Sequence, residues 1–157
     1  MDAITLLKND HDVVEELLTE LASSTSRAVK KSTGLLARIR VELKTHTAIE
    51  EEIFYPAFKA QGDQSADDKM YFEALEEHRA AGELVLPDLL ATPVGSDRFS
   101  GRAKVLKELV THHADEEEQE MFPRARKLLD KAKLSSLGEK MATRKAELVK
   151  QLKSDKA

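Results

Sequence analysis

The feature that most constrains this chain is a histidine and a glutamate one helical turn apart, found twice in nearly the same sequence context. Residues 42–52 and 108–118 match at eight of eleven positions. Each segment contains an H-x-x-x-E pair, His46/Glu50 in the first and His112/Glu116 in the second. Residues four apart share one face of an α-helix. Each segment therefore predicts a helix that presents an imidazole and a carboxylate together.

Two further histidines extend the duplication. His11 lies 35 residues before His46, and His78 lies 34 residues before His112. The chain is therefore interpreted as two copies of a two-helix unit. The helical stretch between each histidine and the neighbouring loop is about 20 Å long, at a rise of about 1.5 Å per residue. In a bundle whose helices alternate in direction, the four histidines are expected to lie in one layer.

Apolar residues recur at spacings of three and four along the chain, which is typical of the seam of an antiparallel bundle. The pattern predicts one helix from Asp2 to the low 20s and a second from Ser32 or Thr33 to Gln61. A third is expected from a capping box at Ser65 and Asp68 to Leu89. The fourth carries Val105, Leu109, His112 and Glu116. Breaks are expected at 23–26 and 92–96, and a weaker fifth helix from Ser136 to about Leu152.

The expected fold class is therefore all-α, an up-down-up-down four-helix bundle with an additional C-terminal helix. The bundle is assigned to residues 1–130. Residues 131–157 are assigned to a helical extension that packs on or beside it.

Composition excludes several other classes of protein. The 157 residues include six Gly, four Pro and no Trp, a helical profile with enough chain for one core. The net charge of −4 comes from interspersed signs, with no basic stripe for nucleic acid. No apolar run is long enough to span a membrane, and the N-terminus has no apolar region typical of a secretory signal. Without Cys, the chain has no disulfide and no cysteine ligand for an iron–sulfur cluster. We expect a cytoplasmic protein with no nucleic-acid or membrane partner; a monomer is favoured, with the oligomeric state open.

The repeated residues predict a metal site. Two carboxylates buried among imidazoles, with no Lys or Arg on the same stripes, would be costly without a cation. The expected ligands are His11, His46, Glu50, His78, His112 and Glu116. Six such ligands are too many for one tetrahedral Zn²⁺ and too rich in nitrogen for Mg²⁺ or Ca²⁺. They suit two iron or manganese ions, and the sequence leaves manganese open.

Neighbouring residues receive secondary roles. His113 is turned about 100° from His112 and is expected at the surface or beside the site. Glu51, Glu52, Glu117 and Glu118 are expected to face mostly solvent. Phe54 is expected to wall the site, whereas Tyr55 is turned away and is not counted as a ligand. Glu42 and Glu108 precede a ligand histidine by one turn; they either accept its outer N–H or are solvated. Pro56 and Pro123 are expected to kink or weaken their helices.

Together with the triplets Phe54-Tyr55-Pro56 and Met121-Phe122-Pro123, these residues resemble the hemerythrin-like family of HHE cation-binding domains over about residues 1–130. The resemblance implies a four-helix bundle with a non-haem di-iron centre. His11 and His46 would hold one iron, and His78 and His112 the other. Glu50 and Glu116 would bridge the irons together with an oxo or hydroxo group.

The chain departs from the oxygen-carrying hemerythrins at two positions. Their fifth histidine, one turn after the third-helix histidine, is here Gly82. Their fourth helix carries H-x-x-x-x-D, whereas Glu116 follows His112 at four residues and Glu117 follows it at five. The four-His, two-Glu set is more similar to the di-iron domain of iron-centre repair proteins and of several bacterial hemerythrin-like proteins. The Cys-containing segment usual in repair proteins is missing here.

Three functions follow as hypotheses. The first is a redox-active di-iron protein acting on O₂, NO or H₂O₂. It would break down peroxide as a catalase-like enzyme or handle nitric oxide and oxidative stress, and whether it is an enzyme stays open. The second is a non-catalytic module that senses oxygen or senses or stores iron. The third is a structural metal bundle, for which six ligands exceed the need.

Overall fold

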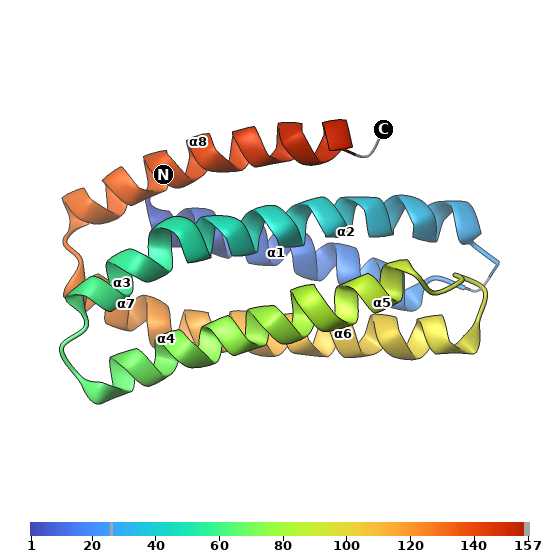
Figure 1. Cartoon of the computed structure of the whole chain (residues 1–157), viewed down its shortest axis with the longest axis horizontal. Coiled ribbons are helices and arrows are strands. Elements are labelled where there is room, and N and C mark those ends of the chain that lie inside the picture. Colours follow the sequence, from blue (N-terminus) through green and yellow to red (C-terminus); the bar gives the residue numbers. More distant parts are fainter. Residues whose placement is uncertain (26, 156–157) are drawn as a thin grey trace.

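The computed structural model describes residues 1–25 and 27–155, which form helices joined by short loops. In Figure 1 the long helices run side by side along one axis, and each reverses the direction of the one before. The predicted all-α, up-down-up-down bundle is confirmed. The elements are α1 (Ala3–Ser23), α2 (Val29–Ile49), η1 (Glu50–Phe54), α3 (Tyr55–Gln61), α4 (Ser65–His78), η2 (Arg79–Val85), α5 (Leu86–Leu90), α6 (Asp97–Glu116), η3 (Glu117–Met121), α7 (Phe122–Leu128) and α8 (Lys131–Asp155).

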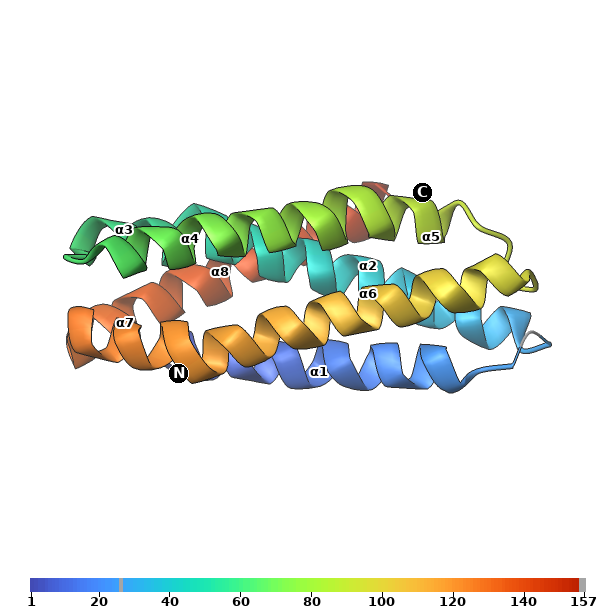
Figure 2. The ribbon, with the colours of Figure 1, turned by 90° about the horizontal axis from the view of Figure 1, so that it is seen from below.

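Several of these elements join end to end into continuous rods. The second rod is α2, η1 and α3, the third is α4, η2 and α5, and the fourth is α6, η3 and α7. Figure 2 shows α1 beside α6, in agreement with the contacts between them. The C-terminal helix α8 packs along α1 and α2 on the outside of the bundle (Figure 1).

Helix starts follow ordinary capping chemistry, with some shifts from the prediction. The Asp2 side chain accepts from the backbone N–H of Thr5, and Ser96 accepts from Phe99. The capping box of α4 uses Gln64 and Asp67, one residue before the predicted Ser65 and Asp68. Likewise α2 and α8 begin three and five residues before the predicted Ser32 and Ser136. Ser26 of the predicted break and residues 156–157 of the predicted extension lie outside the described residues.

Three rods contain a wide π-helical turn immediately before a proline. The backbone N–H groups of Tyr55, Leu86 and Phe122 each donate to the carbonyl five residues earlier. The next residue in each case is Pro56, Pro87 or Pro123, which has no N–H and crowds the carbonyl four residues earlier. A turn with one extra residue relieves that clash and keeps the helix continuous. The weakened helices expected at Pro56 and Pro123 are therefore π turns.

The core is divided into two apolar clusters along the bundle axis. One cluster surrounds Leu7, Phe54 and Phe58 and includes the start of α8. The other surrounds Leu18, Leu86 and Leu106. His11 follows Leu7 by one turn on α1, at the level where the first cluster gives way to the second. A polar layer thus lies between two apolar blocks.

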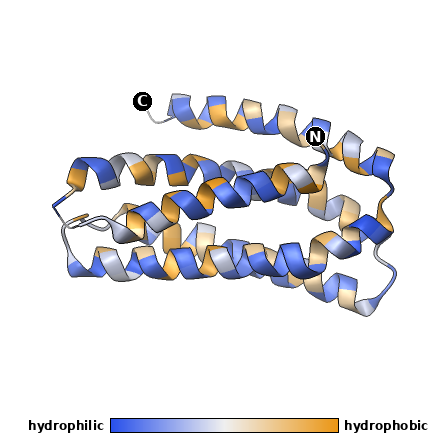
Figure 3. Ribbon diagram, turned by 180° about the vertical axis from the view of Figure 1, so that it is seen from behind, coloured by the Kyte–Doolittle hydropathy of each residue, from blue (hydrophilic) through white to orange (hydrophobic). Residues whose placement is uncertain are grey.

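The rods are amphipathic over their whole length. In Figure 3 hydrophobic and hydrophilic bands alternate along the helices, as expected for stripes that face a shared core. Among the described residues, no helix combines the length and the apolar character needed to cross a membrane.

Candidate metal centre

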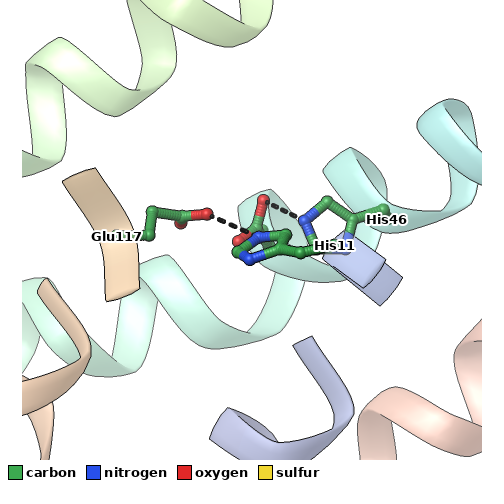
Figure 4. Close-up of side chains that lie close together, drawn as sticks. His11, His46 and Glu117 are labelled. Carbon is green, nitrogen blue, oxygen red and sulfur yellow. Dashed lines mark hydrogen bonds and ion pairs between the residues drawn. The ribbon is translucent and has the colours of Figure 1, made fainter. Parts of the chain in front are cut away.

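Four histidines and two glutamates from all four rods meet in the polar layer. Glu117 Oε1 lies 3.1 Å from Nε2 of both His11 and His113. Glu50 Oε1 lies 3.2 Å from Nε2 of His46 and 3.0 Å from Nε2 of His78. All six side chains are buried. Figure 4 shows His11, His46 and Glu117 pointing toward one another from separate helices.

The six side chains form two overlapping sets of potential ligand atoms. His11, His46, Glu50 and Glu117 place one such atom each within 4.8 Å of one another. Glu50, His78 and His113 form the second set by the same distance. Because Glu50 belongs to both sets, the layer offers two adjoining positions for a cation. The layer contains the expected His11, His46 and His78, but its fourth histidine is His113 and not the expected His112.

The structure corrects the residues expected from the fourth rod. His112 has a side chain that is 64% exposed, and Glu116 is partly exposed beside it. Their places in the layer are taken by His113, which was expected at the surface or beside the site, and by Glu117, which was expected to face mostly solvent. His112 instead pairs with both Glu116 and Glu77 outside the layer.

The sequence contains the signal that identifies the correct residues. His78, His113 and Glu117 each lie 67 residues after His11, His46 and Glu50, and Pro123 lies 67 after Pro56. The local match of residues 42–52 with 108–118 uses an offset one residue shorter. The apolar stripe of α6 agrees with the longer offset, since its buried members are Phe99, Ala103, Leu106, Val110 and His113.

Tyr55 is a site residue that the sequence pattern missed. Its hydroxyl donates to Glu117 Oε2 at 2.8 Å and lies 3.1 Å from Nε2 of His78 and 3.3 Å from Nε2 of His113. An α-helical turn would point Tyr55 away from Glu50, but the π turn places residues five apart on one face. The second half carries Phe122 at the matching position, and its ring stacks on His11. Phe54 packs in the apolar cluster beside the layer, as expected.

Each histidine of the layer also has a carboxylate on its outer nitrogen. Such partners fix the orientation of an imidazole and make it a stronger metal ligand. Glu42 and Glu108, the residues considered for this role, do not take it. The Nδ1 atoms of His11, His46, His78 and His113 pair with Glu118, Asp10, Glu51 and Glu77 at 2.8, 3.0, 2.8 and 2.7 Å.

The charges of the layer depend strongly on one another. Burial opposes the charge on His46, but the carboxylates of Glu50 and Asp10 outweigh it and raise the pKa of His46 to about 10. Burial likewise opposes the charge on Glu50, yet the surrounding imidazoles hold its pKa well below the usual range. The pKa of Tyr55 is raised well above its usual range by burial and by Glu117 and Glu50, so its hydroxyl keeps the proton.

The donor set fits a bound cation. Among the described residues, His46 Nε2 and Glu50 Oε2 are fully buried polar atoms without a hydrogen-bond partner, since the 3.2 Å approach of His46 Nε2 to Glu50 Oε1 lacks hydrogen-bond geometry. Buried polar atoms are normally satisfied, so an unmatched pair aimed into one layer calls for an explanation. Imidazole nitrogens and carboxylate oxygens of this kind are ligands for iron, manganese and zinc. A cation among them would satisfy both atoms and balance the buried carboxylates.

Comparison with known proteins decides the family. The sequence model of the hemerythrin HHE cation-binding domain matches residues 2–125. This chain belongs to the hemerythrin HHE family. Its fold is also that of a crystal structure described as a hemerythrin HHE cation-binding domain-containing protein from Mycobacterium kansasii. That structure has a TM-score of 0.82 and 30% identity, covering 96% of this chain and 89% of that one.

Relatives of this HHE protein occur in Mycobacterium and Nostoc. Uncharacterized proteins of Mycobacterium tuberculosis and Mycobacterium bovis are 30% identical over 145 residues, which is 92% of this chain and 85% of theirs. A DNA nickase of Nostoc is 26% identical over 122 residues, which is 78% of this chain but 33% of that protein.

A cavity of about 300 Å³ connects the layer of this HHE domain with the surface. All four histidines line its inner part, and the exposed residues Lys44 and Glu83 mark its outer part. Gly82 forms part of the wall, and a Cβ added there would meet no atom within 4 Å. The residue at the family's fifth-histidine position thus leaves the space beside the layer open.

Proposed function

We propose that this HHE domain holds two irons and that the loaded protein reacts with O₂, NO or H₂O₂, with peroxide breakdown as its principal chemistry. The proposed ligands are His11, His46, Glu50, His78, His113 and Glu117. Manganese fits the same donors, and metal analysis distinguishes the two. The family match supports metal binding, and the buried His/Glu sets support the choice of residues.

The assignment of ligands follows the internal duplication. His11 and His46 would serve one ion, and His78 and His113 the other. Glu50 and Glu117 lie between these pairs, since each carboxylate is close to imidazoles from both halves of the chain. The corrected set retains the symmetry of four histidines and two glutamates inferred from the family resemblance.

The observation that carries the reaction is the cavity at Gly82. Its volume of about 300 Å³ is roughly ten times the ~30 Å³ that a water molecule occupies in the liquid. The cavity is therefore large enough to hold a diatomic molecule or a peroxide beside the histidines that line it. Among zinc sites, the catalytic ones keep an open coordination position and the structural ones are closed; we infer that the same distinction applies to this centre.

The chain's own groups would direct the chemistry. An iron pair, when bound, would supply the two electrons that one peroxide takes up and accept the two electrons that a second peroxide gives up. In peroxide breakdown one H₂O₂ is reduced to two waters and another is oxidised to O₂, so no outside reductant is consumed. Tyr55 holds a proton at its hydroxyl beside Glu117, and the four outer carboxylates keep the imidazoles in place. The two apolar clusters flank the layer along the bundle axis.

The test is the reaction of iron-loaded protein with each small molecule. Stopped-flow spectra with O₂, NO and H₂O₂, together with an oxygen electrode, should show catalytic O₂ release from peroxide. Glu50→Ala should abolish both iron and turnover, whereas His112→Ala, at an exposed histidine, should keep both. Loaded protein that releases no O₂ from peroxide would contradict the enzymatic proposal.

The alternative is a non-catalytic module that senses oxygen or senses or stores iron. The same cavity supports it, because a ligand can bind reversibly where it can also react. A stable oxygen adduct without peroxide turnover would favour this alternative. The stopped-flow experiment separates the two functions directly.

A further inference from the structure

The C-terminal helix α8 reaches the layer through one lysine. Lys145 Nζ donates to Asp10 Oδ1 and lies 3.4 Å from Glu42 Oε2. The other oxygen of Asp10 accepts from Nδ1 of His46 at 3.0 Å. Asp10 is buried and Lys145 is mostly covered. The chain Lys145–Asp10–His46 therefore joins α8 to the layer by direct contacts.

This chain breaks the symmetry of the site. Asp10 and Glu77 are equivalent in the duplication, since they lie 67 residues apart and hold the outer nitrogens of His46 and His113. Glu77 is contacted from outside by His112, whereas Asp10 is contacted by Lys145. Glu118 and Glu51 hold the other two imidazoles. Four carboxylates hold the outer nitrogens of the histidines: Asp10, Glu51, Glu77 and Glu118. Among the described residues, Asp10 is the one of these four that pairs with a lysine or arginine.

A fixed positive charge behind Asp10 has two effects on His46. It restrains the carboxylate, which fixes the ring that Asp10 orients. It also draws negative charge away from the Asp10–His46 hydrogen bond, so His46 becomes a weaker electron donor than it would be beside a free carboxylate. The burial of Asp10 keeps water from screening this effect.

We infer that Lys145 is a positioning residue of the metal centre, which acts through Asp10 on the orientation and donor strength of His46. Helix α8 begins at Lys131, beyond residues 2–125 that match the family model. A helix outside the shared bundle thus makes the two halves of the centre unequal. For its effect on a bound ion, this inference rests on the proposed function.

The test compares Lys145→Met, which removes the charge, with Lys145→Arg, which keeps it. Lys150→Met, at an exposed position of the same helix, is the matched control. In metal-free protein, the imidazole ¹⁵N signals of His46 should shift in Lys145→Met, while those of His113 stay in place. In iron-loaded protein, Lys145→Met should lower the midpoint potential, because a stronger His46 donor favours the ferric state. Lys145→Arg should keep the His46 ¹⁵N signals and the midpoint potential close to those of the wild type. Lys150→Met should change neither of them.

A double-mutant cycle tests the route through Asp10. Asp10→Asn should weaken metal binding about 10- to 100-fold, the usual cost of losing such a partner. In that background, adding Lys145→Met should produce no further shift of the His46 signals. An equal shift with and without Asp10 would contradict the proposed route.

The metal-free arm separates this inference from the proposed function. If wild-type protein takes up no iron, the proposed function fails, and the His46 signals still decide the role of Lys145. Unchanged His46 signals in Lys145→Met, or an unchanged potential in a variant that holds two irons, would overturn the inference. If Lys145→Met does not fold, Lys145→Gln, which keeps an N–H donor without the charge, takes its place with the same expected outcomes.

Discussion

The Tyr55 hydroxyl donates a 2.8 Å hydrogen bond to Glu117 Oε2, which lies 62 residues further along the chain. The bond links the second and fourth rods at their π-helical turns, since Tyr55 follows η1 and Glu117 begins η3. It also places a phenol that keeps its proton next to a proposed metal ligand. No corresponding bond exists on the other side of the layer, where Phe122 replaces the tyrosine.

Tyr55→Phe should therefore separate metal binding from stability. The variant should still bind metal, because no proposed ligand is removed. In metal-free protein, Glu117 loses a buried donor, which should lower the free energy of unfolding by about 1–3 kcal/mol. Tyr71→Phe, at a half-buried tyrosine packed against Tyr55, should cost less than about 0.5 kcal/mol. Urea denaturation that shows equal losses in both variants would contradict the role of the Tyr55 hydroxyl.

The neighbouring histidines of α6 should behave in opposite ways. His113→Ala should lose metal, since its Nε2 faces both Glu50 and Glu117. His112→Ala should keep the metal content of the wild type, since its side chain lies outside the layer. Elemental analysis of the two folded variants measures this directly. Retention of metal in His113→Ala together with its loss in His112→Ala would restore the register first expected from the sequence.

That register shows where the sequence pattern was sufficient and where it was not. The fold, the layer and the ligands on the first three rods follow from periodicity and from the repeated H-x-x-x-E pairs. The fourth rod was misplaced because Val105, Leu109, His112 and Glu116 also form a stripe at helical spacing. Val105 is largely exposed in the structure, whereas the alternative stripe through Leu106 and Val110 is buried. The offset of 67 residues, which also aligns the prolines, distinguishes the two stripes.

Tyr55 and Lys145 were beyond the pattern for physical reasons. An α-helical projection turns Tyr55 away from Glu50, and the π turn that reverses this depends on how Pro56 is accommodated in the folded helix. Lys145 lies in the last helix, and its contact with Asp10 spans 135 residues. The sequence around Tyr55 or Lys145 gives no indication of the distant residue that each one contacts. Such contacts depend on how the rods pack.

Gly82→His should change the chemistry rather than the fold. The new side chain would enter the cavity, where an added Cβ meets no atom within 4 Å. It would occupy the position of the family's fifth histidine and restrict access to the layer. Peroxide turnover should slow, and an oxygen adduct should live longer. Gly34→His, at an exposed helical glycine with equally free surroundings, is the control. Unchanged turnover and adduct lifetime in a Gly82→His variant that holds two irons would exclude this role.

The metal-free protein should lose stability as the pH rises above neutral. Burial opposes the charge on His46, but Glu50 and Asp10 raise its pKa from about 6.5 to about 10 in the folded chain. The folded state therefore binds this proton more tightly than the unfolded chain does. The resulting stabilisation is complete below about pH 6.5 and is lost as the pH rises through about 10. Thermal denaturation of metal-free protein across this range measures the decline, which should be smaller in His46→Asn.

Metal binding should show the opposite dependence in the same pH range. A cation must displace the protons held by the imidazoles, so its apparent affinity should rise with pH and binding should release protons. Titration of metal into weakly buffered protein detects that release. Affinity that falls as the pH rises would contradict this ligand chemistry.

Gly138 should tolerate no side chain. A Cβ at this position would lie 2.8 Å from the backbone nitrogen of Ala3 and closer still to the carbonyl oxygen of Met1. Gly138→Ala should therefore push α8 away from the start of α1 and cost about 1–3 kcal/mol. Gly101→Ala, in a helix with nothing within 4 Å, should instead stabilise by about 0.5–1 kcal/mol. Denaturant unfolding measures whether the free energy of unfolding falls in Gly138→Ala and rises in Gly101→Ala. A Gly138→Ala variant that is more stable than the wild type would contradict this close packing.

The central claim is that six buried residues hold two irons, and the most direct test is the metal content and absorption spectrum of protein purified in air. We expect two irons per chain with oxo-bridged ferric bands in the near-UV. Glu50→Ala removes the carboxylate shared by both ligand sets and should lose the iron and the bands together. Wild-type protein that takes up no iron, or a Glu50→Ala variant with the same iron content and spectrum as the wild type, would contradict the account.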